Sequence, residues 1–191
     1  MLERFGDRFA PGARILVPLC GKSLDMHWLV ESGYSVVGVE LVESAVAAFF
    51  EEAGWTPEID RSGPHPVYRA NGVELHAASM LDITPKQLGE VTGVYDRAST
   101  IALPPEMRAG FAAHMASLLP ARTEMLMVTV TYDRNEMSGP PFCVPPSEVE
   151  AIFGGPFEIT NLAEDDALDD GMRARGLSAL TEHALWLRRR G

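Results

Sequence analysis

Gly21 and Glu40 have the spacing of a nucleotide-type ligand site. Gly21 lies in a short turn after an apolar run, and Glu40 closes a second apolar run nineteen residues later. In doubly wound folds, an acidic residue about twenty positions after such a glycine hydrogen-bonds the ribose hydroxyls of adenosine-type cofactors. The glycine also lets the backbone come close to a ligand. From spacing alone, a solvated carboxylate at a strand end explains Glu40 equally well.

The turn around Gly21 argues against cofactors that are held by their phosphates. It contains one glycine where the dinucleotide fingerprint needs three, so NAD is disfavoured and a cofactor without phosphates is favoured. Gly21-Lys22-Ser23 matches the end of a P-loop, but Leu16 stands where that loop needs its first glycine. ATP binding is therefore not expected.

Histidine, cysteine and arginine side chains could also take part in chemistry, and each has a structural interpretation beside the functional one. The five histidines show no HExxH pattern and the two cysteines form no CxxC pair, so no metal site is predicted. Cys20 has no readable His/Asp arrangement beside it, which favours a packing role over a nucleophile. Arg97 follows Asp96 at a strand end, and two interpretations stay open. It is either a buried arginine that needs an acceptor as its partner, or half of a surface ion pair with Asp96.

The elements that must position these residues alternate between apolar strands and amphipathic helices, which is typical of parallel βαβ units. Arg14 to Leu19 and Val36 to Glu40 are the first predicted strands. Helices are predicted after them, from about Asp25 to Ser32, capped by Ser23 or Asp25, and from Glu43 to Ala53.

Asn71-Gly72 predicts a hairpin between Val67 to Ala70 and Val73 to Ala77. Further predicted elements are a turn region from Asp60 to Pro66, a strand from Gly93 to Asp96, a helix from Pro104 to Leu118, a strand from Glu124 to Val130, a helix from Pro145 to Phe153, a strand from Phe157 to Asn161, an acidic loop from Glu164 to Asp170 and a strand from Glu182 to Leu187. The total is about seven strands, with the last two as an antiparallel edge hairpin.

Composition limits the class of protein. The chain has 191 residues, 46% of them hydrophobic, which fits one domain over residues 1–191 that can bury its own core. With 16 Lys and Arg against 27 Asp and Glu, the net charge of −11 makes nucleic acid a poor partner. Two distant cysteines and the lack of a leader or of an apolar stretch of about 18–20 residues predict a reduced, cytoplasmic protein that is not bound to a membrane.

Several unusual strings place the chain beside a known family. They are Val17-Pro18-Leu19-Cys20-Gly21-Lys22-Ser23-Leu24-Asp25-Met26, Val37-Gly38-Val39-Glu40-Leu41, Tyr95-Asp96-Arg97-Ala98, Ala102-Leu103-Pro104-Pro105-Glu106-Met107-Arg108, and Gly139-Pro140-Pro141-Phe142 with Val144-Pro145. In order and spacing, from about Arg14 onward, the chain closely resembles the bacterial thiopurine S-methyltransferase family.

The resemblance implies a Rossmann-like class I methyltransferase fold, a mostly parallel seven-stranded α/β sheet with helices on both faces and an antiparallel C-terminal hairpin. It also implies S-adenosyl-L-methionine as cofactor and methyl transfer to the sulfur of aromatic and heterocyclic thiols, with selenium and tellurium compounds as further acceptors in bacterial members. A small-molecule thiol is then the partner, and a monomer is favoured.

The same resemblance assigns site residues. Leu19 and Gly21 line the cofactor pocket, Glu40 holds the ribose hydroxyls, and Ser79 and Met80 lie beside the adenine. Arg97 lies beside the methionine end of the cofactor and the acceptor, where its charge would stabilise a thiolate. Pro141 and Phe142 form a wall of the acceptor pocket. No general base is assigned, because an aromatic thiol already presents a thiolate.

The chain departs from the family at its start, where members carry about two dozen additional residues with a tryptophan that covers the active site. Met1 lies only 13 residues before Arg14, and Leu2-Glu3-Arg4-Phe5 contains no tryptophan. Without that cover we expect weak cofactor binding and little turnover. One alternative is therefore a cofactor-binding protein with little catalysis. The other is a nicotinamide-dependent oxidoreductase, which shares the βαβ pattern and the acidic residue at the strand end but is disfavoured by the missing glycines.

Overall fold

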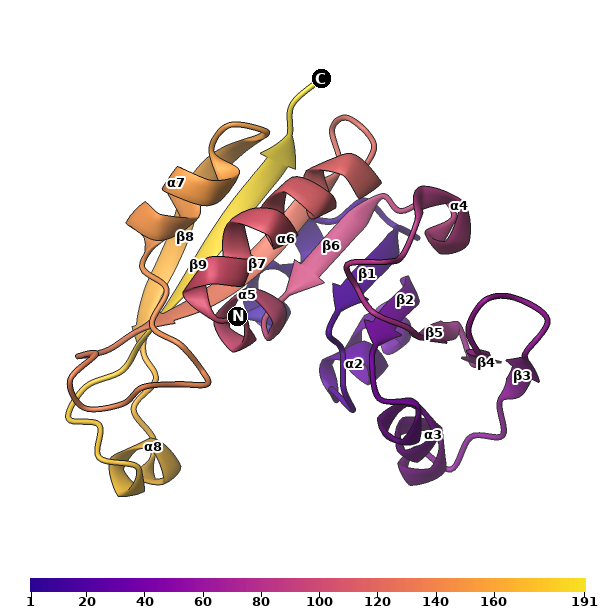
Figure 1. The fold of residues 1–191 in the computed structure, drawn as a ribbon, viewed down its shortest axis with the longest axis horizontal. Helices are drawn as coiled ribbons and strands as arrows, with labels where there is room; N and C mark the ends of the chain where they lie inside the picture. Colours follow the sequence, from indigo (N-terminus) through magenta and orange to yellow (C-terminus); the bar gives the residue numbers. More distant parts are fainter. The chain divides into compact units, whose positions relative to one another are not determined.

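A computed structural model describes residues 1–191, and the chain divides into two compact units (Figure 1). The first unit is Leu2–Tyr95, and the second is Asp96–Gly191 together with Met1. Each unit is built around its own strands, and each is described separately below.

The first unit is an α/β sheet whose centre is parallel. Its strands follow the order β3-β4-β5-β2-β1-β6, in which β5, β2, β1 and β6 are parallel neighbours and the pairs β3/β4 and β4/β5 are antiparallel. The strands are β1 (Arg14–Pro18), β2 (Ser35–Glu40), β3 (Glu58–Asp60), β4 (Val67–Ala70), β5 (Val73–Ala77) and β6 (Gly93–Asp96), the last ending on the first residue of the second unit.

Short helices connect these strands. They are α1 (Leu2–Phe5), the 3₁₀ helix η1 (Gly6–Arg8), α2 (Asp25–Glu31), α3 (Glu43–Glu52) and α4 (Pro85–Leu88). The apolar face of α3 packs against β2, β4 and β5, with Phe49 and Phe50 buried. The predicted cap of α2 is wrong: Leu24 is the N-cap residue, no side chain caps it, and Ser23 Oγ accepts only the N–H of Asp25 at 3.3 Å.

The hairpin predicted at Asn71-Gly72 is confirmed, because β4 and β5 pair in antiparallel register from Val67↔His76 to Ala70↔Val73. Asn71 and Gly72 have φ angles of +48° and +81°, as a two-residue turn of this hand requires. The turn leads the chain into β5, whose carboxyl end lies beside that of β2 with Glu40 opposite Ala77.

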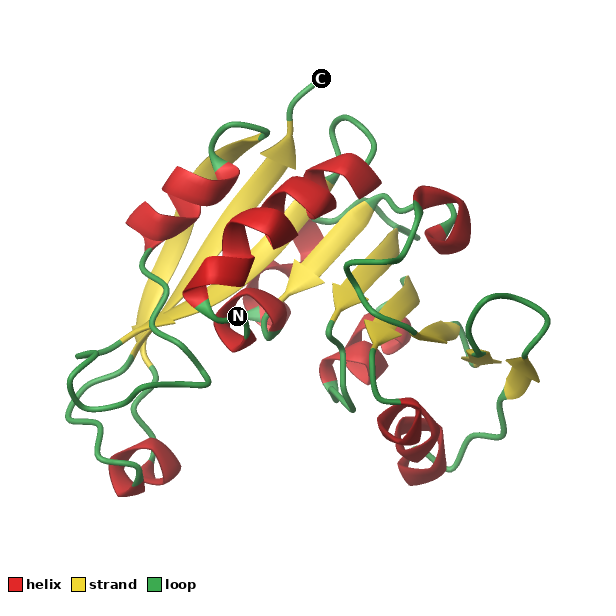
Figure 2. Ribbon diagram, in the orientation of Figure 1, coloured by secondary structure: helices red, strands yellow, loops and turns green.

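The second unit combines a three-stranded antiparallel sheet with four helices (Figure 2). The strands are β7 (Glu124–Thr131), β8 (Phe157–Asp166) and β9 (Thr181–Arg189), in the order β7-β9-β8, and the helices are α5 (Ser99–Ala102), α6 (Pro105–Leu118), α7 (Pro146–Phe153) and α8 (Asp170–Ala174). The predicted C-terminal hairpin is confirmed by the pairing of β8 with β9.

The structure has nine strands where about seven were predicted, and they form a mixed rather than mostly parallel arrangement. β3 was not predicted, and only its last residue, Asp60, lies in the expected turn region. β8 continues through Glu164–Asp166, where a solvated acidic loop was expected. Hydrogen bonding of β8 to β9, across a register shift between Asn161 and Ala163, holds these acidic residues extended. Pairing with a neighbouring strand thus outweighs their low intrinsic β propensity. None of the helices has the length and apolar character needed to span a membrane.

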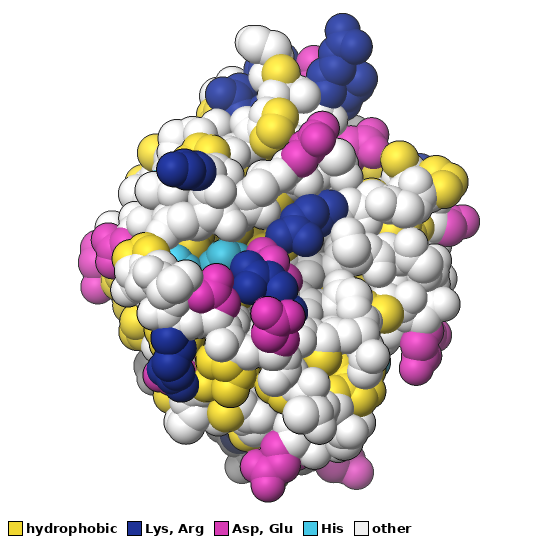
Figure 3. All heavy atoms as spheres, turned by 90° about the vertical axis from the view of Figure 1, so that its right-hand side faces the viewer, with side chains coloured by type: hydrophobic (Ala, Val, Ile, Leu, Met, Phe, Trp, Pro, Cys, Tyr) yellow, Lys and Arg dark blue, Asp and Glu magenta, His cyan; other side chains and the backbone are white.

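One face of the molecule carries histidine side chains surrounded by acidic and basic side chains (Figure 3). In the first unit, Glu74 Oε1 lies 2.8 Å from Arg14 Nη2 and 2.9 Å from His76 Nε2, and Glu74 Oε2 lies 2.6 Å from Arg69 Nε. The chain of contacts continues from His76 Nδ1 to His65 Nε2 at 2.9 Å. Desolvation raises the pKa of Glu74, but hydrogen bonds from His76 and Arg69 and the charge of Arg14 outweigh it and lower the pKa to about 2.

Acidification should therefore destabilise the first unit through Glu74. Its pKa in the folded chain lies below its ordinary value of 4.5, so its contribution to stability is complete above about pH 4.5 and is lost as the pH falls toward about 2. We expect the free energy of unfolding to fall less steeply over this range in Glu74→Gln than in wild type. Denaturant titrations at a series of pH values measure this slope, with Glu90→Gln as an exposed control. Parallel slopes for wild type and Glu74→Gln would contradict the assignment.

Candidate functional site

The turn after β1 has the backbone geometry of a ligand loop. Leu19 and Gly21 have φ angles of +47° and +49°, in the left-handed region that a non-glycine residue such as Leu19 adopts only under constraint. The N–H of Cys20 between them donates to Val39 O at 3.1 Å, which holds the turn against the end of β2. A Cβ on Gly21 would meet no atom within 4 Å, so the space above this glycine is open.

Glu40 ties this turn to the next one. Its Oε2 accepts the N–H of Gly21 at 3.0 Å, and its Oε1 accepts the N–H of Val42 at 2.9 Å. Each carboxylate oxygen retains a second acceptor position. The two residues that the sequence places nineteen positions apart are thus in direct contact. The alternative interpretation of Glu40 was a carboxylate that is only solvated at the end of a strand. It does not account for the two backbone hydrogen bonds that this side chain accepts.

Ser79 and Met80 follow β5 at the same edge of the first unit. The N–H of Ala78 donates to Glu40 O at 2.9 Å, which brings this segment beside Glu40. Ser79 is partly buried, and its Oγ accepts the N–H of Leu81 at 3.2 Å. Met80 is only 5% exposed, so its side chain packs inward. Leu19, Gly21, Glu40 and the Ser79-Met80 segment therefore gather at the carboxyl ends of β1, β2 and β5, where open α/β sheets bind ligands.

The packing role predicted for Cys20 is confirmed. Its side chain is 4% exposed, and burial together with the charge of Glu40 raises the pKa of the thiol. A Cβ on Gly38 would lie 2.7 Å from Cys20 Sγ and 2.4 Å from a methyl group of Leu75. The glycine inside β2 is thus required by the close approach of Cys20 and Leu75.

In the second unit, Asp96 is a buried acceptor rather than half of a surface ion pair. It is 1% exposed, and its Oδ1 accepts the N–H groups of Ser99 and Thr100 at 3.0 and 3.3 Å. Its Oδ2 accepts the hydroxyl of Thr100 at 2.7 Å. Burial raises the pKa of Asp96 and these hydrogen bonds oppose the rise. Arg97 is exposed, so the expectation of a buried arginine is wrong.

Two hydrogen bonds hold the C-terminal end of the Gly-Pro-Pro-Phe segment within the second unit. The N–H of Phe142 donates to Ile101 O at 2.6 Å, and the Tyr132 hydroxyl donates to Pro141 O at 2.7 Å. Gly139 has φ +83°, and a Cβ there would lie 2.4 Å from the Phe142 ring. Glycine is therefore needed for the ring to take this position, next to the loop that follows Asp96 and Arg97.

A cavity of about 200 Å³ lies beside Phe142. Its walls come from α6 and from the segment after β7, and they consist of Pro105, Arg108, Tyr132, Arg134, Met137, Ser138, Phe142 and Cys143. Phe142 lines this cavity, whereas Pro141 is not among the lining residues. No sequence pattern singled out Tyr132 or Arg134, and Arg108 appeared only as the last residue of one of the strings that resemble the family.

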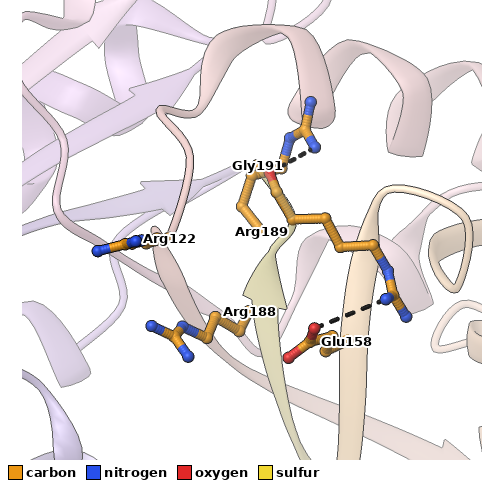
Figure 4. Close-up of a pocket in the computed structure, with 6 residues that line it drawn as sticks. Arg122, Glu158, Arg188, Arg189 and Gly191 are labelled. Carbon is orange, nitrogen blue, oxygen red and sulfur yellow. Dashed lines mark hydrogen bonds and ion pairs between the residues drawn. The ribbon is translucent and has the colours of Figure 1, made fainter.

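A second cavity, of about 350 Å³, lies at the opposite end of β7 (Figure 4). Arg122, Glu158, Arg188, Arg189, Arg190 and Gly191 line it. Arg190 lies 3.6 Å from Glu158, and Arg189 donates to Pro156 O at 3.2 Å. Because Arg188 pairs with Glu124 at the start of β7, this cavity is at the amino end of that strand. None of the predicted site residues lines it.

Comparison with known proteins gives a consistent assignment. The family model described as Thiopurine S-methyltransferase (TPMT) matches residues 1–190. A thiopurine S-methyltransferase of Azotobacter vinelandii is 42% identical over 95% of this chain and 84% of its own length. One from Methylococcus capsulatus is 45% identical over 98% and 87%.

Solved structures agree in fold. A SAM-dependent methyltransferase from Anabaena variabilis superposes with a TM-score of 0.69 at 16% identity, covering 99% of this chain and 82% of that one. The magnesium protoporphyrin IX methyltransferase of Synechocystis, determined with bound SAM, gives 0.65 at 17% identity and covers 96% and 73%. These likenesses show the class I methyltransferase fold, and with the match over nearly its whole length the chain belongs to the thiopurine S-methyltransferase family.

Proposed function

We propose that this protein transfers the methyl group of S-adenosylmethionine to the sulfur of aromatic and heterocyclic thiols. The observation that carries the proposal is the family match over residues 1–190, with curated thiopurine S-methyltransferases 42% and 45% identical to the chain. Selenium and tellurium compounds remain further candidate acceptors. The nicotinamide oxidoreductase and the binding protein without turnover are not favoured by these relatives.

The residues of the first unit fit S-adenosylmethionine. The backbone above Gly21 is open, and Glu40 keeps one acceptor position on each oxygen for ribose hydroxyls. The turn lacks the further glycines that would hold a pyrophosphate. S-adenosylmethionine contains no pyrophosphate, so it does not need them. When bound, it supplies a methyl group on a sulfonium, which is the electrophile. We assign its ribose to Glu40, its neighbouring backbone contacts to Leu19 and Gly21, and its adenine to Ser79 and Met80.

The residues of the second unit would position the acceptor. We propose that the Arg97 guanidinium stabilises the acceptor thiolate, and that Phe142 provides an aromatic wall. In the reaction a bond forms from the thiolate sulfur to the methyl carbon, while the electron pair of the broken bond stays on the sulfonium sulfur and makes it a neutral thioether. Because the electrophile is supplied by the cofactor, the protein mainly contributes alignment.

The wider setting of the protein belongs to the same proposal. Both cysteines are free, which supports the cytoplasm as its compartment. We propose one methyltransferase domain over residues 1–191, acting as a monomer on a small thiol and not on nucleic acid. The charge of −11 supports the last point.

Incubation with labelled S-adenosylmethionine and a panel of aromatic thiols, selenite and tellurite tests the activity. We expect label in the methyl thioethers of aromatic or heterocyclic thiols. Label in none of the products, from protein that binds S-adenosylhomocysteine by calorimetry, would favour the binding protein without turnover. Stabilisation by NAD and not by S-adenosylhomocysteine in thermal unfolding would overturn the cofactor assignment.

Arg97→Lys should lower turnover at least tenfold with little effect on folding. A point charge cannot reproduce the planar contacts of a guanidinium, and an exposed side chain contributes little to stability. Initial rates at saturating cofactor measure the effect, with Arg173→Lys as a control at another exposed arginine of the same unit. Wild-type rates for Arg97→Lys across several thiols would show that Arg97 is not part of the reaction.

A further inference from the structure

Arg108 is a buried arginine whose guanidinium is only partly paired. It is 1% exposed, in the first turns of α6. Its Nε donates to Leu103 O at 2.9 Å, and its Nη1 is paired with Glu148 Oε1. Its Nη2 has no hydrogen-bond partner in the protein. Buried donors are nearly always paired, so an unpaired one is a candidate to bind an acceptor from outside the chain.

The unpaired nitrogen belongs to a residue that lines the cavity of about 200 Å³ beside Phe142. The guanidinium carbon of Arg108 lies 5.5 Å from the centre of the Phe142 ring. Tyr132 and Met137 complete a partly apolar wall. An aromatic ring bearing one acceptor group would match both the apolar wall and the free donor.

The charges around the cavity favour an anion as that acceptor group. Arg134 also pairs with Glu148, through Oε2 at 3.1 Å, so one carboxylate is shared by two guanidinium groups. The cluster of Arg108, Arg134 and Glu148 therefore keeps one net positive charge, in a chain whose total is −11. An anionic oxygen at Arg108 Nη2 would make a charge-assisted hydrogen bond and neutralise the cluster.

The position of the cavity in the second unit suits an acceptor site. α6 begins with Pro105, and Tyr132 follows directly after β7, so the walls come from the amino end of the helix and the carboxyl end of the strand. The same cavity is lined by Phe142, which the family resemblance assigns to the acceptor pocket.

We propose that Arg108 is a specificity-determining residue, whose Nη2 binds an anionic oxygen on the ring of the methyl acceptor. This rests on the proposed function, because it takes the acceptor to be an aromatic thiol. Among aromatic thiols, those that carry a carboxylate on the ring are preferred over uncharged ones, and Arg108 sets that preference.

The test is a ratio of specificities within each protein. We compare kcat/KM for the best of the three mercaptobenzoates with kcat/KM for benzenethiol, in wild type, Arg108→Met and Arg108→Lys. Arg108→Met leaves Glu148 paired with Arg134, so the carboxylate is not left without a counter-charge. Because removing one partner of a buried ion pair destabilises the fold, thermal unfolding is measured for each variant. Arg108→Lys serves if the methionine variant fails to fold. Arg173→Met is the control, since Arg173 is an exposed arginine of the same unit that does not line the cavity.

Wild type is expected to prefer the mercaptobenzoate at least tenfold, and substitution of Arg108 to reduce that ratio at least tenfold, mainly through KM for the mercaptobenzoate. A merely structural role would lower both rates equally and leave the ratio unchanged, which would overturn the proposal. Arg173→Met should keep the wild-type preference.

Calorimetry with benzoate separates this proposal from the proposed function, because benzoate has no sulfur to methylate. Benzoate binding that Arg108→Met weakens at least tenfold supports the site even if no thiol is turned over, in which case only the methyl-transfer assignment fails. Equal benzoate affinity in wild type and Arg108→Met, or no binding to wild type at millimolar concentration, would overturn the role of Arg108.

Discussion

Glu40→Gln is expected to weaken binding of S-adenosylhomocysteine about tenfold to a hundredfold, since a hydrogen bond to a charged acceptor contributes about 1.5–3 kcal/mol. In the protein alone, Oε2 and Oε1 of Glu40 accept the N–H groups of Gly21 and Val42. A glutamine has one oxygen, so in either orientation its amide NH₂ faces one of these donors. The substitution therefore removes the charge for ribose binding and also disturbs one of the two turns that shape the pocket.

Titration calorimetry with S-adenosylhomocysteine measures this loss. The matched control is Glu52→Gln, which removes an exposed carboxylate 2.5 Å from Lys22 of the same turn and should leave the affinity unchanged. Thermal unfolding of both variants separates a local change at the pocket from loss of the fold. An unchanged dissociation constant in Glu40→Gln would remove Glu40 from the cofactor site.

The parts of the site that could be predicted depend on signals that are local in the chain. The contact of Gly21 with Glu40 follows from strand-turn-helix order, because parallel neighbours bring the carboxyl ends of β1 and β2 together. The hairpin at Asn71-Gly72 is specified by two residues that tolerate positive φ. Most strands and long helices were likewise predicted to within a few residues of their ends.

The parts that could not be predicted depend on partners far away in the chain. Arg108 is paired with Glu148, which lies forty residues later in the chain. The residues next to Arg108 in the sequence indicate neither its burial nor its unpaired nitrogen. The extension of β8 through acidic residues depends on β9, which composition cannot indicate. Burial at a strand end was assigned to Arg97, whereas the structure buries its neighbour Asp96. Asp96 is the one that points inward because the N–H groups of Ser99 and Thr100 and the Thr100 hydroxyl donate hydrogen bonds to it.

Asp96→Ala should be the most destabilising of these substitutions, by about 3–5 kcal/mol, because it leaves three buried donors without an acceptor. The donors are the N–H groups of Ser99 and Thr100 and the Thr100 hydroxyl, so the start of α5 loses its fixed geometry. Ile101 O, which accepts the N–H of Phe142, lies in the same short helix. We therefore expect the Gly-Pro-Pro-Phe segment to loosen as well, with lower kcat/KM for aromatic thiols in whatever fraction remains folded. Urea unfolding followed by circular dichroism measures the loss of stability.

Asp96→Asn is the control that identifies the cause. An asparagine oxygen can still accept both N–H groups, and its amide can donate to the Thr100 hydroxyl, which accepts as readily as it donates. Because burial raises the pKa of Asp96, the uncharged asparagine also avoids the cost of a buried carboxylate. We expect Asp96→Asn to lose less than about 1 kcal/mol and to keep most of its turnover. Equal destabilisation by alanine and asparagine would mean that the negative charge, rather than the hydrogen-bond geometry, holds the loop that carries Arg97.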